Sequence, residues 1–333
     1  MPLVTDKKQV LEIYAEAAQR KWVIPCICCE NLTTIEAILA ALKEYGEKIG
    51  VYNLPVTIAI TNCYAHRSQS INYTFTRNWE VGIRLFIEDL KVLTSSCSPF
   101  KDLRVMLHLD HIQHDVDQDI LSWDMKQFSS IMFDASTLNF DQNIDATRKF
   151  VEQQSQNIVI EGACDEIIDS GSGGNELTTP VNAERYMRET GCDFIVANLG
   201  TEHRASDSEL KYYGDLARQI KSKIGTKIVL HGASSVGKEQ ITKLFDDGVC
   251  KVNIWTILER DSTTKLFEQM IKNASKIVGA KHALELQKQG LLGDNAGFDG
   301  EKSIHFYTTL YRQQIIFDEM KRIVTGFLSI WYV

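Results

Sequence analysis

The sequence predicts an α/β protein, a single (β/α)8 TIM barrel, and three observations support this prediction. Short apolar, β-branched runs recur along the chain, separated by segments whose apolar residues have helical spacing. The runs number eight, which is the number of strands that closes this barrel. No G-x-G-x-x-G motif follows the first run, which disfavours the alternative, a doubly wound sheet that binds a dinucleotide.

The expected strands are short and mostly apolar. They cover residues 23–29, 55–61, 104–110, 129–135, 157–163, 193–200, 226–232 and 249–255. We expect one barrel domain over residues 1–333, with a C-terminal helical extension from about residue 280.

The first long helix is expected directly after the first strand. In NLTTIEAILAALKEYG, residues 31–46, Thr33 and Glu36 are placed as a capping box and Gly46 is placed to end the helix. Further helices are expected over residues 79–93, 180–191 and 212–225.

Composition excludes several classes of partner. Of the 333 residues 44% are hydrophobic and 24% charged, the formal net charge is -8, and no basic stripe suggests a nucleic acid. No apolar run approaches the roughly 18 residues that span a bilayer, and the N-terminus lacks a signal-peptide core. We therefore expect a cytoplasmic protein with no membrane partner, in which Cys26, Cys28 and Cys29 are buried reduced thiols.

Three histidines stand at the ends of three expected strands: His111, His203 and His231. A closed barrel brings the ends of distant strands to one rim. Catalytic zinc sites use three protein ligands and keep a fourth position open for substrate. The three histidines therefore predict a metal centre at the mouth of the barrel.

Other polar residues near the strand ends allow two interpretations. Asp134 either belongs to the site or caps the following helix, and residues 232–235 form either an ordinary turn or a backbone site for phosphate. His108 shares a strand face with Asp110 and is expected to be packed, whereas His114 is expected on a helix surface.

Six short motifs follow one another along the expected barrel. They are LHLDH (107–111), SSIMFDAS (129–136), IEG (160–162), LGTEH (199–203), IVLHGASSV (228–236) and GVCKVNIWT (248–256). In this order the chain resembles the class II, metal-dependent ketose-bisphosphate aldolases, the family of fructose-1,6- and tagatose-1,6-bisphosphate aldolases. The resemblance implies reversible cleavage of a phosphorylated ketose to dihydroxyacetone phosphate and an aldehyde, through a metal-stabilised enediolate.

The resemblance also implies roles for individual residues. His111, His203 and His231 would bind Zn²⁺ or another divalent metal, with a monovalent cation as a further ion. Asp110 would move the proton of the hydroxyl on the carbon that becomes the aldehyde. The positions that match the family's substrate and phosphate contacts are Thr61, Gly232, Ala233, Ser234, Asn253 and Thr256.

A general base and the partners follow from the same resemblance. Glu176 stands after a pair of glycines as the family's base does, and Glu166 is the other candidate. The implied partner is a small-molecule sugar phosphate, and the implied assembly is a homo-oligomer, either a dimer or a tetramer.

The chain departs from the family's pattern around the expected metal centre. Arg204 replaces a glycine after the second histidine, and Ala163 replaces an acidic residue after the fifth strand. Trp255 fills a site that is Asp or Ala in the family, and its indole should narrow the pocket. The tail over residues 303–324 matches poorly, so no arginine is assigned to a second phosphate.

Two alternatives to an aldolase remain, and the departures motivate the first of them. One is a catalytically lapsed barrel that binds a metal or a sugar phosphate for regulation or assembly. The other is a different metal-dependent barrel enzyme, such as a hydrolase, which is disfavoured because the first strand, VIPCICC, lacks the H-x-H motif that such hydrolases usually have.

Overall fold

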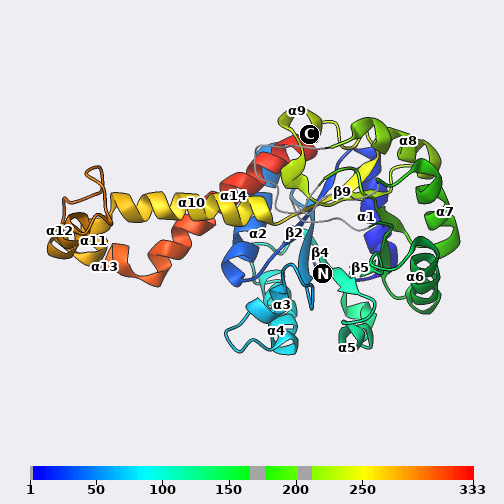
Figure 1. Cartoon of the computed structure of the whole chain (residues 1–333), viewed down its shortest axis with the longest axis horizontal. Helices are drawn as coiled ribbons and strands as arrows, with labels where there is room; N and C mark the ends of the chain where they lie inside the picture. The colour runs from blue at the N-terminus through cyan, green and yellow to red at the C-terminus, as the bar shows by residue number, and fades with distance from the viewer. Residues whose placement is uncertain (1–2, 166–176, 202–211) are drawn as a thin grey trace.

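The strands of the protein form one parallel sheet that closes on itself (Figure 1). The structure is a computed structural model, and it describes residues 3–165, 177–201 and 212–333. The strands are β1 Leu3–Val4, β2 Ile24–Cys28, β3 Pro55–Thr61, β4 Arg104–Gln113, β5 Ser130–Asp134, β6 Val159–Ala163, β7 Phe194–Val196, β8 Ile228–Leu230 and β9 Val249–Ile254.

The order of the strands makes the sheet a barrel. The order is β1-β4-β3-β2-β9-β8-β7-β6-β5, every pair is parallel, and β4 pairs again with β5 to close the ring. Strands β2 to β9 are the eight predicted strands, so the fold is the TIM barrel that the sequence predicts. The extra strand β1 pairs with the start of β4. Two residues are too few to show a period in the sequence.

Helices cover the outside of the barrel (Figure 1). Before the C-terminal region they are α1 Lys7–Gln19, α2 Leu32–Ile49, α3 Gln69–Asn72, α4 Trp79–Leu93, α5 Gln118–Leu121, α6 Phe140–Gln154, α7 Pro180–Thr190, α8 Gly214–Ile224 and α9 Lys238–Ile241. The predictions for α4, α7 and α8 are confirmed to within two residues at each end.

The expected boundaries of α2 are wrong at both ends. The N-cap is Asn31, whose side chain accepts a hydrogen bond from the backbone N–H of Thr34, so Thr33 and Glu36 form no capping box. The helix continues past Gly46 and ends at Gly50, which has a φ of 72°. Gly46 is required for packing instead, because a Cβ there would lie 2.5 Å from the carbonyl oxygen of Val51.

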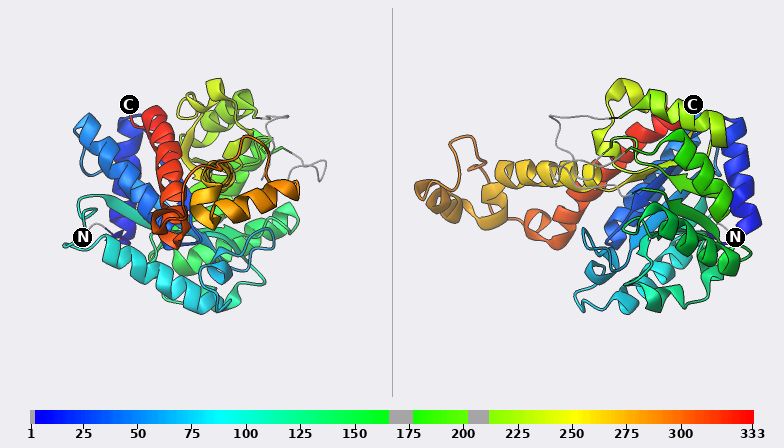
Figure 2. Two further views of the ribbon diagram at one scale, coloured as in Figure 1. Left: turned by 90° about the vertical axis from the view of Figure 1, so that its left-hand side faces the viewer. Right: turned by 45° about the vertical axis from the view of Figure 1, so that its right-hand side comes forward.

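The C-terminal helices project from the barrel and return to it (Figure 2). They are α10 Thr256–Lys272, α11 Ala274–Val278, α12 Ala280–Lys288, α13 Ile304–Tyr307 and α14 Thr309–Trp331. Helix α14 runs back beside α10 and packs on α2, where Val324, Leu328 and Trp331 are buried. No helix in the described part of the chain is long and apolar enough to cross a membrane.

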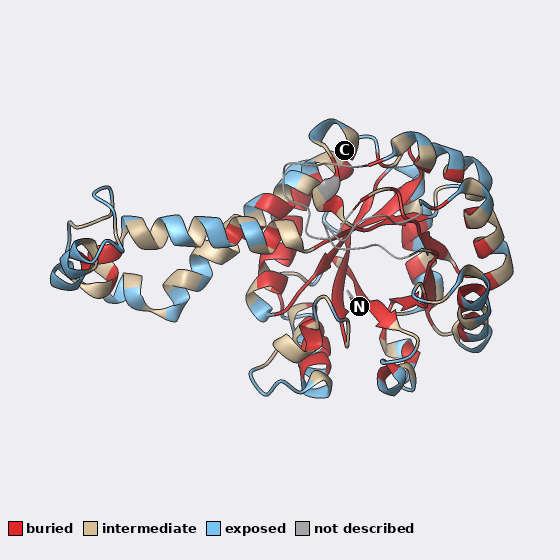
Figure 3. Ribbon diagram, viewed as in Figure 1, coloured by how far each residue is buried: buried red, intermediate tan, exposed pale blue. Residues whose placement is uncertain are grey.

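The buried residues lie mainly in the barrel (Figure 3). The strands are buried along almost their whole length, whereas the projecting helices are mostly half-buried or exposed. Strands covered on both faces cannot alternate between apolar and polar residues. This explains why the sequence shows continuous apolar runs.

Candidate metal centre and active site

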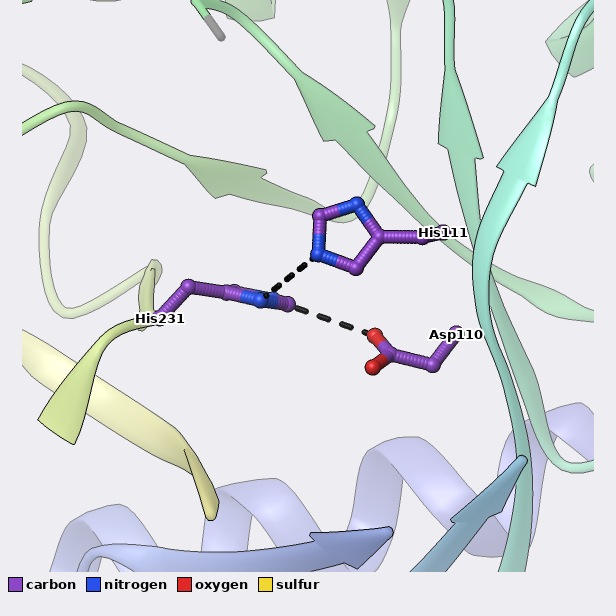
Figure 4. A group of neighbouring side chains, drawn as sticks. All are labelled: Asp110, His111 and His231. Carbon is purple, nitrogen blue, oxygen red and sulfur yellow. Dashed lines mark hydrogen bonds and ion pairs between the residues drawn. The ribbon is translucent and has the colours of Figure 1, made fainter. Parts of the chain in front are cut away.

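A backbone irregularity in β4 turns two consecutive side chains toward the same point. The pairing of β4 with β5 shifts register between Leu109 and Ile112, and His111 between them has a φ of 48°. In a regular strand, neighbouring side chains point to opposite faces. Here Asp110 and His111 converge with His231 at the mouth of the barrel (Figure 4), and the ligand atoms of all three lie within 4.8 Å of one another.

These three buried residues have the spacing of a metal site. The Nε2 atom of His111 lies 3.1 Å from the Nδ1 atom of His231, and His231 Nε2 lies 3.9 Å from Asp110 Oδ1. Two nitrogens bound to one tetrahedral Zn²⁺ stand about 3.3 Å apart, given Zn–N bonds of about 2.0–2.1 Å. The distance between the His111 and His231 nitrogens therefore fits two ligands of one divalent metal. The expected third ligand, His203, lies outside the described residues.

Asp134 orients His111. Its carboxylate accepts hydrogen bonds from His111 Nδ1 at 3.0 Å, from Gln113 Nε2 at 2.9 Å and from the backbone of Ser136 at 3.1 Å. Asp134 does not cap α6, whose N-cap is Asn139. An imidazole that donates from Nδ1 keeps Nε2 as its free lone pair, so Asp134 selects the nitrogen available to a metal.

The pKa values of Asp134 and His111 are shifted in opposite directions. Burial raises the pKa of Asp134, but the hydrogen bond and the charge of His111 outweigh it and bring the value to about 2. Burial lowers the pKa of His111, but Asp110 and Asp134 outweigh it and raise the value above the ordinary one. Asp134 is therefore ionised at neutral pH.

Asp110 is an ionised carboxylate in a closely packed site. Its Oδ1 accepts a hydrogen bond from Asn253 Nδ2 at 2.9 Å, and its Oδ2 accepts one from the thiol of Cys28 at 3.2 Å. Burial raises the pKa of Asp110, but His111, His108 and His231 together hold it well below the usual range. A carboxylate kept in this form can accept a proton from a substrate hydroxyl.

His108 is fully buried behind Asp110, as predicted. Its Nδ1 atom is 2.8 Å from the hydroxyl of Ser130, and its Nε2 atom is 3.6 Å from Asp110 Oδ1. The prediction for His114 is wrong, because this residue lies in the turn after β4 and not on a helix. The strand runs three residues beyond the expected end at Asp110, which moves the next helix further along the chain.

One pocket joins the cluster to the residues expected to hold substrate. The expected residues that line it together with Asp110, His111 and His231 are Thr61, Gly232, Ala233, Ser234, Asn253 and Thr256. The expected base Glu176 and the alternative Glu166 fall outside the described residues, as does Arg204.

Thr61 also shapes the segment that follows β3. Its hydroxyl donates to the carbonyl oxygen of Arg67 and accepts a hydrogen bond from the backbone N–H of Gln69 at 3.0 Å. The side chain of Gln69 accepts from the backbone N–H of Thr61 at 3.0 Å. These bonds fold the segment back, so Arg67 lies at the pocket.

Several pocket residues were not expected from the sequence. Tyr64 stacks on the ring of His111, with the ring centroids 4.2 Å apart and the planes at 7°. Cys28 and Arg67 line the same pocket. Cys28 could have been found from its place at the end of the first barrel strand, but Tyr64 and Arg67 lie in a segment without a motif.

The fold and the site together define a TIM-barrel protein with a candidate metal centre at the carboxyl ends of its strands. The chain belongs to the class II fructose-bisphosphate aldolase family, because the family model "Fructose-bisphosphate aldolase class-II" matches residues 8–294. The resemblance inferred from the six motifs is confirmed at this level.

Individual relatives are distant. The fructose-bisphosphate aldolase of Treponema pallidum (strain Nichols) is 26% identical over 289 residues, which cover 73% of this chain and 80% of that protein. The crystal structure of the fructose-bisphosphate aldolase of Campylobacter jejuni is 17% identical, with a TM-score of 0.76, and the match covers 99% of this chain and 95% of that one. The YdjI aldolase of Escherichia coli K12 is 15% identical, with a TM-score of 0.65 and coverage of 96% and 95%. Likeness to these structures confirms the fold.

Proposed function

We propose that this protein is a metal-dependent aldolase that cleaves a phosphorylated ketose reversibly to dihydroxyacetone phosphate and an aldehyde. The observation that carries the proposal is the ionised Asp110 beside the His111–His231 pair, in a pocket that also contains Asn253. Family membership suggests the type of reaction. The buried cluster contains two imidazoles that could hold a metal and a carboxylate that could accept a proton.

A divalent metal held by His111 and His231, with His203 as the expected third ligand, would polarise the ketose carbonyl. Asp110 would accept the proton of the hydroxyl on the carbon that becomes the aldehyde. As the bond between this carbon and its neighbour breaks, the electron pair stays on the carbon of dihydroxyacetone phosphate. A proton then reaches that carbon from a general acid, for which Glu176 is our candidate.

Substrate binding is assigned to the two strand ends beside the cluster. The backbone after β8, at Gly232, Ala233 and Ser234, would hold the phosphate on the ketone side, because small residues leave N–H groups open to an anion. Asn253 and Thr256 would bind hydroxyl or phosphate oxygens from the end of β9. We further propose a cytoplasmic homo-oligomer, a dimer or tetramer, whose mass light scattering would measure.

The test starts with protein purified with its metal. Elemental analysis should find about one divalent ion per chain, as expected for a site of this type. Nuclear magnetic resonance should show proton exchange at the hydroxymethyl carbon of dihydroxyacetone phosphate, which tests half of the reaction without knowledge of the aldehyde. Metal-loaded protein that neither exchanges this proton nor cleaves any phosphorylated ketose would refute the proposal.

A second candidate function is a barrel that binds a metal or a sugar phosphate but does not catalyse cleavage. Ala163 favours it, because this buried residue ends β6 where the family has an acidic side chain. Replacing Asp110 by Ala separates the two functions. If ligand binding and cellular function survive this change intact, the second function is the correct one.

A further inference from the structure

The pocket has a second end, distant from residues 232–234 along the rim of the barrel. Around the ring the strands follow in the order β8, β9, β2 and β3. Gly232, Ala233 and Ser234 follow β8, whereas Cys28 ends β2 and Arg67 follows β3. If the phosphate of the ketone half lies after β8, the aldehyde half of the substrate faces Cys28, Arg67 and Trp255.

Contacts with Glu30 and Trp255 hold the Arg67 side chain in place at this second end of the pocket. Its Nε donates a hydrogen bond to Glu30 Oε1 at 2.8 Å, and its Nη2 donates one to Glu30 Oε2 at 2.5 Å. The guanidinium carbon lies 5.4 Å from the centroid of the Trp255 ring. A guanidinium has five N–H groups, so this contact occupies one parallel pair of donors and leaves a phosphate only the remaining three.

Among the described residues, the positive charge at this end of the pocket has a negatively charged neighbour. Of the described residues that line the pocket, Arg67 is the only lysine or arginine, and Glu30 beside it is 8% exposed. Glu259 belongs to the same cluster, because burial and the charge of Glu30 raise its pKa, against Arg67, to about 7. Arg67 and Glu30 therefore offset each other, although the Arg67 side chain is 45% exposed. Among the described residues that line the pocket, no further lysine or arginine is left to pair with a phosphate dianion at this end.

Trp255 forms the wall of this end. Its indole packs against Cys26, Cys28 and Ala59 on the inner face of β2 and β3. An apolar aromatic wall suits the C–H faces and hydroxyls of a sugar better than an ionic group.

We propose that the aldehyde end of this pocket accepts an uncharged group, so that the substrate is a ketose 1-phosphate and not a ketose bisphosphate. The inference rests on the proposed function and names its class of substrate. The single phosphate stays with dihydroxyacetone phosphate, and the product from the other half is a neutral hydroxyaldehyde. The bond between carbons 3 and 4 breaks, carbon 3 takes the electron pair and a proton, and the hydroxyl on carbon 4 loses its proton as the carbonyl forms.

Cleavage of fructose 1-phosphate and fructose 1,6-bisphosphate by the metal-loaded protein tests the proposal. The two probes differ by one phosphate at the end that faces Arg67 and Trp255. We expect kcat/KM to be at least about tenfold higher for the monophosphate, since a phosphate would meet a neutralised arginine and an apolar wall. Equal rates, or a preference for the bisphosphate, would overturn the proposal.

Two variants test whether Glu30 and Trp255 set this preference. Glu30→Gln removes the charge that neutralises Arg67, and Trp255→Ala removes the wall; each should lower the ratio of monophosphate to bisphosphate kcat/KM by about tenfold. The matched control is Glu80→Gln, which breaks an exposed ion pair with Arg84 on α4 and should leave the ratio unchanged. An unchanged ratio in both pocket variants would contradict the assignment.

Binding measurements separate this proposal from the proposed function. Isothermal titration calorimetry ranks the two ketose phosphates even on protein that does not turn over. Proton exchange into dihydroxyacetone phosphate with tighter binding of the bisphosphate means that the aldolase function stands and the substrate class is wrong. Tighter binding of the monophosphate without exchange means that the substrate class stands and the aldolase function is wrong.

Discussion

Lys251 and Glu161 form an ion pair across the interior of the barrel, with Nζ 2.5 Å from Oε1, and neither side chain is exposed to solvent. Lys251 comes from β9 and Glu161 from β6. His108 Nε2 lies 3.3 Å from the ammonium and 3.7 Å from the carboxylate. His108 also lies 3.6 Å from Asp110, so it connects the buried ion pair to the candidate site.

Loss of one partner of this pair should destabilise the protein strongly. Lys251→Met leaves the Glu161 carboxylate buried without a cation, and we expect the free energy of unfolding to fall by about 3–5 kcal/mol. Urea unfolding followed by circular dichroism measures this change. Lys43→Met, which breaks an exposed pair with Glu47, is the control and should change stability little. A loss no greater than that of the control would show that the pair is not buried as described.

The contact between Asp134 and His111 should set the affinity for metal. Asp134→Ala removes the acceptor that orients the imidazole, and we expect metal affinity to fall about 10–100-fold. Competition with a chromophoric chelator measures the dissociation constant. Asp115→Ala removes a carboxylate on the same side of the barrel that is 62% exposed, and it should leave the affinity unchanged. Equal affinities for the Asp134 variant and the wild type would mean that Asp134 does not orient His111 for metal binding.

Asp110→Asn should separate cleavage from proton exchange. The amide keeps the size of the side chain but cannot accept the hydroxyl proton, so cleavage should slow by about 10²–10⁴-fold. Proton exchange at dihydroxyacetone phosphate should persist, because it does not involve that hydroxyl. Steady-state cleavage and exchange followed by nuclear magnetic resonance check both expectations. Equal losses in the two assays would assign Asp110 to metal binding instead.

Glu259 should make the protein less stable as pH rises. Burial, followed by the charge of Glu30, raises its pKa from 4.5 to about 7 in the folded state. Between these values the folded protein binds more protons than the unfolded chain, so stability falls as pH rises through this window and is level above it. Glu259→Gln removes the loss and should stabilise the protein at pH 8 by about 1–3 kcal/mol.

Urea unfolding at pH 5 and pH 8 measures the effect of Glu259→Gln. The variant should gain stability over the wild type at pH 8 and much less at pH 5. Glu268→Gln, at an exposed position of α10, is the control and should show no such difference. A gain of equal size at both pH values would mean that the ionisation of Glu259 is not its cause.

The barrel was predictable because its evidence is local. A strand whose one face is covered by helices and whose other face lies in the barrel core is apolar over its whole length. Each of these strands can therefore be recognised in the sequence as a continuous apolar run. The strand over residues 55–61 and the helix over 79–93 match their predicted bounds. The boundaries of α2 were not predictable in this way, because Gly46 serves a contact with Val51 and not a helix end.

The candidate site was predictable in part for the same reason. Asp110, His111 and His231 are polar residues at the ends of apolar strands, and closure of a barrel gathers such ends on one rim. The sequence by itself therefore determined the fold class and the chemical character of the site.

The tertiary structure alone decided how those groups are oriented and what surrounds them. The left-handed backbone at His111 turns this side chain to the same point as Asp110, and Asp134, 23 positions further along the chain, selects the imidazole nitrogen that stays available. Likewise, the contacts of Arg67 with Glu30 and Trp255 join three separate strand ends. Contacts between residues far apart in the chain leave no periodic pattern in the sequence, so only the folded protein reveals them.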